Sequence, residues 1–221
     1  MNKTMRYFIY LTLLYIFPAP LSAADEAATG IDHSHLSQHV LNKALAGYDF
    51  AKKNSTVSDN NLITIIDFDL PSYIPRAFVY NIKTKHVIFE ALVAHGKGSG
   101  RGAYATSFSN QNNSDATSLG VFVTKNIYTG KHGTAMRLEG LEHGLNDHAM
   151  QRDVVIHSAW YVSKTFAKEH HRVGNSWGCF AFSKEAKDKL ISLIGSNSVI
   201  FAYDKSEDQD QNLAGDTATN E

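Results

Sequence analysis

Leu62-Ile-Thr-Ile-Ile-Asp-Phe68 is the stretch on which the fold prediction rests. It is short, apolar and rich in β-branched residues, which is typical of a strand buried in a sheet. Gly-, Ser- and Asn-rich segments separate similar short runs along the chain, at 76–82, 87–94, 119–124, 135–139, 153–157, 180–182 and 199–203. Many short strands with few helices predict a mostly β fold with accessory helices, built as a barrel or a sandwich.

Two helices are expected beside these strands. Apolar residues recur at helical spacing from Leu36 to Tyr48, with Ser34 as the expected N-cap. Ser183 is expected to cap a second helix, and Gly195 stands where a left-handed residue commonly ends a helix. We therefore divide the chain into an N-terminal helical segment and linker at 25–61 and one domain at 62–203.

Both ends of the chain have a distinctive composition. Residues 1–24 follow the pattern of a secretory signal peptide: a basic start, an apolar run at 7–17, and the small residues Ser22 and Ala24 before the expected cleavage site. The alternative is an uncleaved anchor, but the run is shorter than the ~20 residues of a membrane span, so we expect no stable span. Residues 204–221 are acidic and nearly free of apolar side chains, which predicts a disordered tail.

Charge and cysteine content narrow the possible functions. The formal net charge is −1, which gives no reason to expect nucleic acid as a partner. Cys179 is the only cysteine, so the domain has no internal disulfide. A lone thiol in an exported protein is either a small buried apolar group or a reactive one, and its neighbours decide between these alternatives.

A histidine and a glycine accompany this thiol. Asp153-Val-Val-Ile-His157 ends one apolar strand, and Gly174-Asn-Ser-Trp-Gly-Cys179 leads into another. An imidazole near a cysteine can take the thiol proton, and the thiolate can then attack a carbonyl carbon. Gly178 lets the backbone approach a substrate and turn an amide toward an oxyanion. A backbone carbonyl or the Ser176 hydroxyl could orient His157.

This constellation resembles the catalytic signature of the L,D-transpeptidases, the family with the YkuD-type fold, and most closely its murein L,D-transpeptidase catalytic-domain branch. Ile156-His157 and Ser176-x-Gly178-Cys179 carry the resemblance, which spans about 62–203, with further blocks at 93–100, 108–110, 118–122, 128–133, 137–142 and 161–163. The chain departs from the wider pattern at four positions. Ser158 and Ala181 stand where glycine and arginine are common, and Asn175 and Phe180 where the closer branch has Arg and Pro.

The resemblance implies a YkuD-like β-barrel or sandwich catalytic domain at 62–203 and a peptidoglycan L,D-transpeptidase. Cys179 would form a thioester with a tetrapeptide stem and pass the acyl group to an amine, with His157 as the general base and the Gly178 backbone in the oxyanion region. Ser176 is counted with the catalytic residues because its hydroxyl could orient His157. The alternatives are an L,D-carboxypeptidase or other cysteine peptidase of cell-wall peptides, and a wall-binding module without activity. We expect no cofactor, peptidoglycan stem peptides as partners, a monomer, and a location in the periplasm or cell wall.

Four further residues are expected to contact the substrate. His95 lies in a Gly-rich loop after a strand, and Arg137 could bind a carboxylate through two hydrogen bonds. Trp177 and Tyr161 are expected to form walls of the cleft. The alternatives are a surface loop for His95, salt bridges for Arg137 and core packing for the two aromatic residues. The eleven histidines form no His-Glu-x-x-His arrangement, so the sequence predicts no metal site.

Overall fold

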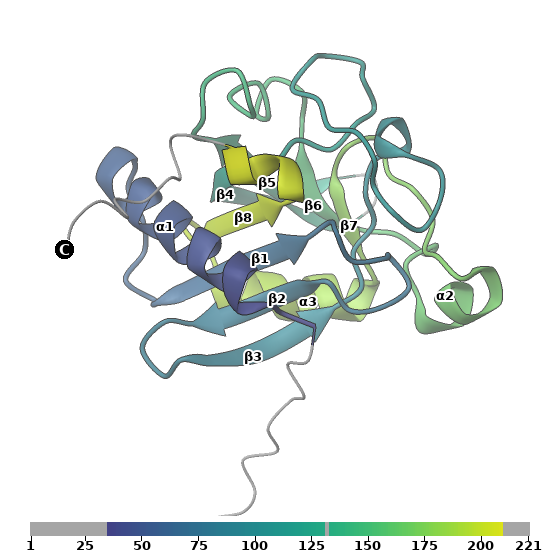
Figure 1. Cartoon of the computed structure of the whole chain (residues 1–221), viewed down its shortest axis with the longest axis horizontal. Coiled ribbons are helices and arrows are strands. Elements are labelled where there is room, and N and C mark those ends of the chain that lie inside the picture. The colour runs from purple at the N-terminus through teal and green to yellow at the C-terminus, as the bar shows by residue number, and fades with distance from the viewer. Residues whose placement is uncertain (1–34, 131–132, 210–221) are drawn as a thin grey trace, which may run out of the picture. The chain divides into compact units, whose positions relative to one another are not determined.

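The computed structural model describes residues 35–130 and 133–209, all within the compact unit Ile31–Glu221 (Figure 1). The expected signal peptide and Ser34 lie outside the described residues. Within these ranges the strands are β1 (Leu62–Asp67), β2 (Ala77–Asn81), β3 (His86–Ala91), β4 (Gly120–Gly130), β5 (Gly133–Gly140), β6 (Val155–Ser158), β7 (Phe180–Phe182) and β8 (Val199–Tyr203). The helices are α1 (Gln38–Asn54), α2 (Lys164–His170), α3 (Lys184–Ile194) and the 3₁₀ turns η1 (Lys97–Ser99) and η2 (Lys205–Gln209).

All eight strands belong to one mixed sheet in the order β3-β2-β1-β8-β4-β5-β6-β7. Neighbours are antiparallel except for β1 with β8 and β6 with β7, which are parallel. The two ends of the sheet meet, because Ala94, just after β3, forms an antiparallel bridge with Ala181 of β7. The predicted mostly β fold with accessory helices is confirmed, and this bridge brings the sheet close to a closed barrel.

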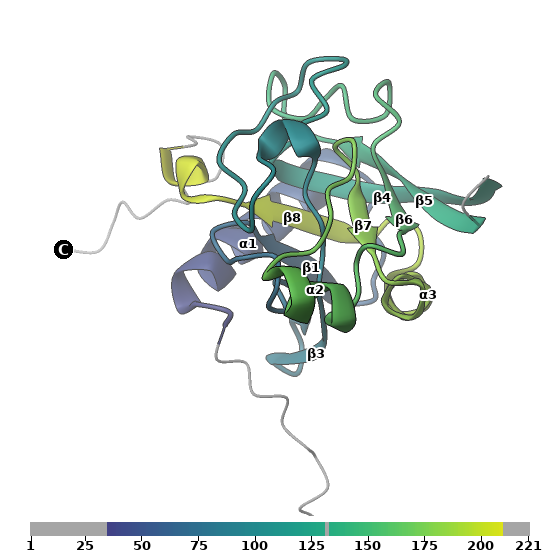
Figure 2. The same cartoon turned by 90° about the vertical axis from the view of Figure 1, so that its right-hand side faces the viewer.

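Helices cover both faces of the central strands, which explains why β1 is buried along its whole length. Alternate β1 residues enter different cores: Ile63 and Ile65 pack with α1, whereas Leu62 and Ile66 pack in the core that contains the α3 side chains. In Figure 2, α1 and α3 accordingly lie on opposite sides of the strands. No helix in the described part of the chain is long and apolar enough to cross a bilayer.

The predicted helices are present, with one boundary corrected. The Ser183 hydroxyl accepts from the Ala186 amide at 3.1 Å, and Gly195 ends α3 with a φ of 61°, as predicted. The first helix begins at Gln38 rather than Leu36, and Ser37 caps it through the Val40 amide. The short helix α2 was not predicted, because only Ala167 among its residues is buried and the segment has no apolar stripe.

Two further expectations are corrected at segment ends. The strand expected to start at Asp153 begins at Val155, because Asp153 adopts a left-handed backbone conformation with a φ of 52°. Residues 204–209, expected to begin a disordered tail, are folded: Asp204 is buried, and the Asp208 carboxylate accepts from the Tyr203 hydroxyl and lies 2.7 Å from His39 Nε2. Composition alone could not show that Tyr203 and His39 provide hydrogen-bond partners for the Asp208 carboxylate. Residues 210–221 lie outside the described residues.

Candidate active site

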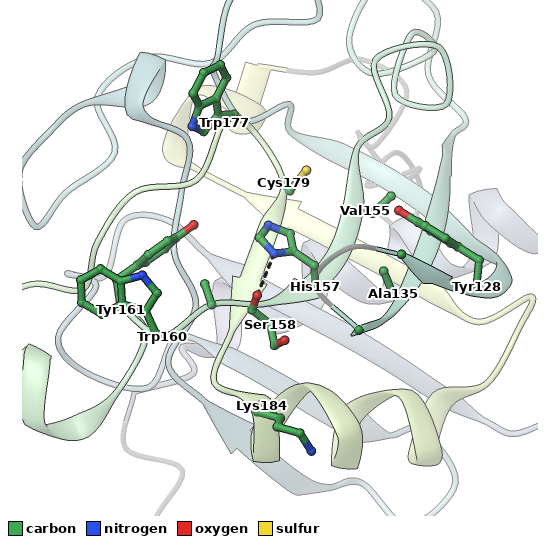
Figure 3. Close-up of a pocket in the computed structure, with 13 residues that line it drawn as sticks. Tyr128, Ala135, Val155, His157, Ser158, Trp160, Tyr161, Trp177, Cys179 and Lys184 are labelled. Carbon is green, nitrogen blue, oxygen red and sulfur yellow. Dashed lines mark hydrogen bonds between the residues drawn. The ribbon is translucent and has the colours of Figure 1, made fainter.

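Sheet register brings the predicted nucleophile and base together. In the parallel pair β6–β7, His157 lies opposite Ala181. Because side chains alternate between the faces of a strand, Cys179, two residues before Ala181, projects on the same face as His157. Both residues line one pocket of about 760 Å³, and Figure 3 shows the imidazole between Ser158 and Cys179.

The imidazole of His157 is oriented by the backbone. Its Nδ1 lies 3.0 Å from the Ser158 carbonyl oxygen. A carbonyl oxygen only accepts hydrogen bonds, so Nδ1 carries the hydrogen in this contact and Nε2 of the neutral ring keeps a lone pair. Of the two orienting groups suggested by the sequence, the carbonyl of Ser158 is therefore the one in contact. That leaves Nε2 as the basic nitrogen.

Ser176 and Gly178 shape the turn that carries the thiol. The buried Ser176 hydroxyl donates to the Cys179 carbonyl at 2.6 Å and accepts from the Gly178 amide at 3.2 Å. Gly178 has a φ of 112°, and a Cβ there would lie 2.8 Å from the Ala116 carbonyl oxygen. Only glycine fits without strain. The Gly178 amide donates to the Ser176 hydroxyl within the turn. Its predicted role, donating to an oxyanion, would require this hydrogen bond to break.

The environment of the thiol keeps it protonated. Burial is the largest influence and raises the pKa of Cys179; a hydrogen bond from the Val155 backbone and the charge of Arg152 lower it, and the Asp153 carboxylate raises it. The thiol lies 3.5 Å from the Asp153 carbonyl oxygen, which the left-handed conformation of Asp153 turns toward it. Attack on a carbonyl therefore requires a base that removes the proton.

Aromatic side chains form the walls of the pocket. The predicted cleft residues Tyr161 and Trp177 both line it, and contact with a substrate stays a prediction for each. Gly174 packs against the Tyr161 ring, where an added Cβ would lie 2.6 Å away. The sequence interpretation missed Tyr128 and Trp160, which also line the pocket. Trp160 is 81% exposed, and its position next to Tyr161, just after the histidine strand, was the available signal.

His95 and Arg137 occupy other places than expected. His95 is buried, 1% exposed, with Nδ1 2.8 Å from Arg76 Nη2 and Nε2 3.0 Å from the Gly100 carbonyl. It therefore does not line the pocket, because the loop that follows it folds over the ring. Arg137 pairs with Asp153 at 2.7 Å and stacks on Tyr128, which lines the pocket, so Arg137 lies beside the pocket and does not line it.

A second, polar pocket also borders Cys179. Its volume is about 520 Å³, and Cys179 and Trp177 line both pockets. Its remaining lining is charged or amide-bearing: Asn112, Asn113, Asp115, Gln151, Arg152 and Asp153. Cys179 thus borders two pockets, an aromatic one that His157 also lines and a polar one that His157 does not line. Across residues 35–130 and 133–209, no group of three or more His, Cys, Asp or Glu side chains is arranged to hold a metal ion.

A family model described as the L,D-transpeptidase catalytic domain matches residues 32–203. The chain belongs to this family. No curated protein sequence matches it significantly.

Solved L,D-transpeptidases are similar to the chain at low identity. An imipenem complex of LdtMt1 is 15% identical with a TM-score of 0.41, covering 65% of this chain and 59% of that one. An L,D-transpeptidase from Mycobacterium smegmatis is 13% identical, with a TM-score of 0.40 and the same coverage. A mutant L,D-transpeptidase from Enterococcus faecium is 12% identical, with a TM-score of 0.40, covering 66% and 50%. The chain therefore spans less than two thirds of these proteins.

The four departures from the L,D-transpeptidase pattern are accommodated by packing. Asn175 donates to the Gly100 carbonyl at 3.1 Å and so ties the catalytic turn to the loop after His95. Phe180 is fully buried and meets Phe122 edge-on, with ring centroids 5.5 Å apart. Ala181 forms the bridge that closes the sheet. The Ser158 carbonyl, which orients His157, is a backbone group that any residue would supply.

Proposed function

We propose that this member of the family is a peptidoglycan L,D-transpeptidase that acts through a Cys179 thioester. The observation that carries the proposal is that His157 of β6 and Cys179, the residue before the parallel strand β7, line one pocket. Membership of the L,D-transpeptidase catalytic domain family supports the reaction class. The expected substrate is the tetrapeptide stem, cut at the bond between its L-centre and its terminal D-alanine.

The proposed chemistry begins with proton transfer from the thiol to Nε2 of His157. The sulfur then bonds to the carbonyl carbon, and the tetrahedral intermediate collapses by breaking the carbon–nitrogen bond. His157 returns the proton to the departing amine of D-alanine. An acceptor amine next attacks the thioester, the carbon–sulfur bond breaks, and the thiol is restored. Because burial keeps the resting thiol protonated, the thiolate forms only when His157 takes the proton at the start of the reaction.

Family membership supports transfer to an amine. An acyl donor in the aromatic pocket leaves the polar pocket beside Cys179 open to an acceptor. This pocket does not select an ammonium group by charge, because Asp115 and Asp153 pair with Lys97 and Arg137 and because Arg152 adds a positive charge. Transfer to water instead would make the protein an L,D-carboxypeptidase.

Export to the periplasm or cell wall and a monomeric state belong to the same proposal. Light scattering of the mature chain tests the monomeric state.

The test is turnover of purified tetrapeptide muropeptides, followed by mass spectrometry. We expect Cys179→Ala to form no product, and His157→Ala to lose at least about a hundredfold in rate because it lacks the base. His143→Ala is the matched control, since the His143 side chain is fully exposed and pairs only with Asp147 among the described contacts. Product at the wild-type rate from Cys179→Ala would contradict the proposal. The ratio of crosslinked to trimmed product separates transpeptidase from carboxypeptidase.

A further inference from the structure

Arg152, in the turn before β6, gives all four of its Nη hydrogens to one segment. Nη1 donates to the Ser109 carbonyl at 2.7 Å and to the Ser118 hydroxyl at 2.5 Å. Nη2 donates to the Ala116 carbonyl at 2.6 Å and to the Ser114 hydroxyl at 3.2 Å. A planar, forked guanidinium can join four acceptors, which a lysine ammonium with three hydrogens cannot do. The side chain therefore fixes the shape of the segment 109–118.

The segment that Arg152 holds packs directly behind the catalytic turn. An added Cβ at Gly178 would lie 2.8 Å from the Ala116 carbonyl oxygen and 3.4 Å from Arg152 Nη2. The next residue, Thr117, accepts from the Gly96 amide at 2.9 Å through its hydroxyl, so the segment also holds the loop after His95. The position of the Gly178–Cys179 peptide therefore depends on the segment 109–118, which Arg152 holds in shape.

Arg152 also brings a charge that its partners do not neutralise. All four acceptors are neutral oxygens, and no carboxylate in the described part of the chain forms an ion pair with it. The neighbouring cations differ, because Arg137 pairs with Asp153 and Lys97 with Asp115. Arg152 and Cys179 line the same polar pocket. The other ionisable groups that line the two pockets with Cys179 are Asp115 and Asp153 in the polar pocket and Tyr128, His157, Tyr161 and Lys184 in the aromatic pocket.

We propose that Arg152 is a positioning residue for the Cys179 nucleophile: it fixes the segment 109–118 behind Gly178 and holds an unneutralised positive charge beside the sulfur. The inference rests on the proposed role of Cys179. A guanidinium in this place favours the thiolate that forms when His157 removes the proton. It also keeps the turn from moving as the sulfur bonds to the substrate.

Alkylation of Cys179 by iodoacetamide tests this without any peptidoglycan substrate. The thiolate sulfur displaces iodide, so the rate at each pH reports the thiolate fraction. In the full chain we expect Arg152→Met to react about tenfold more slowly at pH 7, with its rate profile moved to higher pH. Arg152→Lys should retain most of the reactivity, while amide hydrogens of residues 109–118 exchange faster. The control Arg101→Met removes an exposed arginine and should change neither measurement.

Two results would overturn the inference. One is an alkylation profile of Arg152→Met that coincides with that of Arg101→Met, which would remove the charge effect. The other is an Arg152→Lys variant whose amide hydrogens at residues 109–118 exchange as slowly as in the wild type, which would contradict the positioning effect. This second measurement also tests the inference if Arg152→Met does not fold. If Arg152→Met shows the expected alkylation shift but the wild-type protein does not turn over muropeptides, the proposed function is contradicted and the inferred role of Arg152 stands.

Discussion

Arg76 links the interior of the sheet to the loop behind the catalytic turn, at the scale of single residues. Its guanidinium is fully buried and donates to the carbonyls of Leu70 and Val93 and to Nδ1 of His95. Because Nδ1 accepts this bond, Nε2 of His95 carries the hydrogen and donates to the Gly100 carbonyl. Protonation of Nδ1 would abolish the contact with Arg76. Burial, followed by the Arg76 charge, accordingly lowers the pKa of His95 to about 4.

Asp67 is the buried carboxyl group near Arg76, and it lowers stability at neutral pH. Burial raises its pKa to about 6, although the Asp69 amide and the Arg76 charge act in the other direction. We expect Asp67→Asn to raise the free energy of unfolding at pH 7.5 by about 1–3 kcal/mol, since the uncharged amide avoids the desolvation penalty and can still accept from the Asp69 amide.

Urea unfolding at pH 7.5 checks this expectation. Asp59→Asn is the matched control, because Asp59 is exposed and its replacement should change the unfolding free energy by less than about 0.5 kcal/mol. A destabilised Asp67→Asn would mean that attraction to Arg76 outweighs desolvation.

At the residue scale, the sequence can select candidates where a proposed chemistry demands a residue type. Cys179 and His157 could be selected because a thiol, an imidazole and a preceding glycine form a recognisable set. Arg76 and Arg152 could not, because their contacts come from backbone carbonyls and hydroxyls far along the chain. His95 was misjudged for the same reason: a Gly-rich loop looks exposed until a buried arginine is known to lie beneath it.

The helix α1 shows how an element docks through its smallest residue. Gly47 faces the sheet, where an added Cβ would lie 3.0 Å from Val121 Cγ2 and 3.3 Å from the Phe201 ring. Ala44, Tyr48 and Ala51 extend this buried face. The glycine is unfavourable for an isolated helix by about 1 kcal/mol relative to alanine, so its presence indicates that close approach to β4 and β8 matters more.

Gly47→Val should therefore destabilise the protein by about 1–3 kcal/mol. The two added methyl groups would push α1 away from Val121 and Phe201, and overpacking of this kind is not recovered by the gain in helix propensity. Urea unfolding measures the loss, with Asp49→Val as the control at an exposed position of the same helix. Equal stabilities for the two variants would contradict the close approach.

Elements with a strong periodic signal were predicted, and those without one were not. The apolar stripe located α3 and its Ser183 cap, and β-branched runs located β1 and β8. The position of Ser37 as the true cap of α1 depends on one hydroxyl contact, which two nearby serines made ambiguous. The seven-residue helix α2 has one buried residue and so no detectable stripe.

At the scale of the whole molecule, strand order carries information that no single segment contains. β1 pairs in parallel with β8, more than a hundred residues later, and β6 in parallel with β7. Neither pairing follows from the composition of the strands, because any two of these apolar runs could form a ladder. The second pairing is the one that sets Cys179 beside His157, so the proposed catalytic geometry depends on topology as well as on the signature residues.

Two buried groups with large pKa shifts make opposing contributions to the pH dependence of overall stability. His95 has a folded pKa of about 4, below the ordinary value of 6.5, so its contribution is complete above pH 6.5 and is lost as the pH falls toward 4. Asp67 has a folded pKa of about 6, above the ordinary 3.8, so its contribution is complete below 3.8 and is lost as the pH rises through 6. Each shift corresponds to about 3 kcal/mol, so the two largely offset each other.

Single variants should reveal the two opposing pH dependences of the unfolding free energy, which largely cancel in the wild type. Relative to wild type, Asp67→Asn should lose about 3 kcal/mol of stability between pH 7 and pH 4, because only the His95 contribution remains. His95→Gln should gain about as much over the same range, since an amide can still accept from Arg76 and donate to Gly100 while only Asp67 titrates. The double variant should run parallel to wild type. Urea unfolding at pH 4, 5, 6 and 7 gives all four profiles, and differences between them cancel the other titrating groups. Parallel profiles for all four proteins would show that neither group titrates with the shift its burial implies.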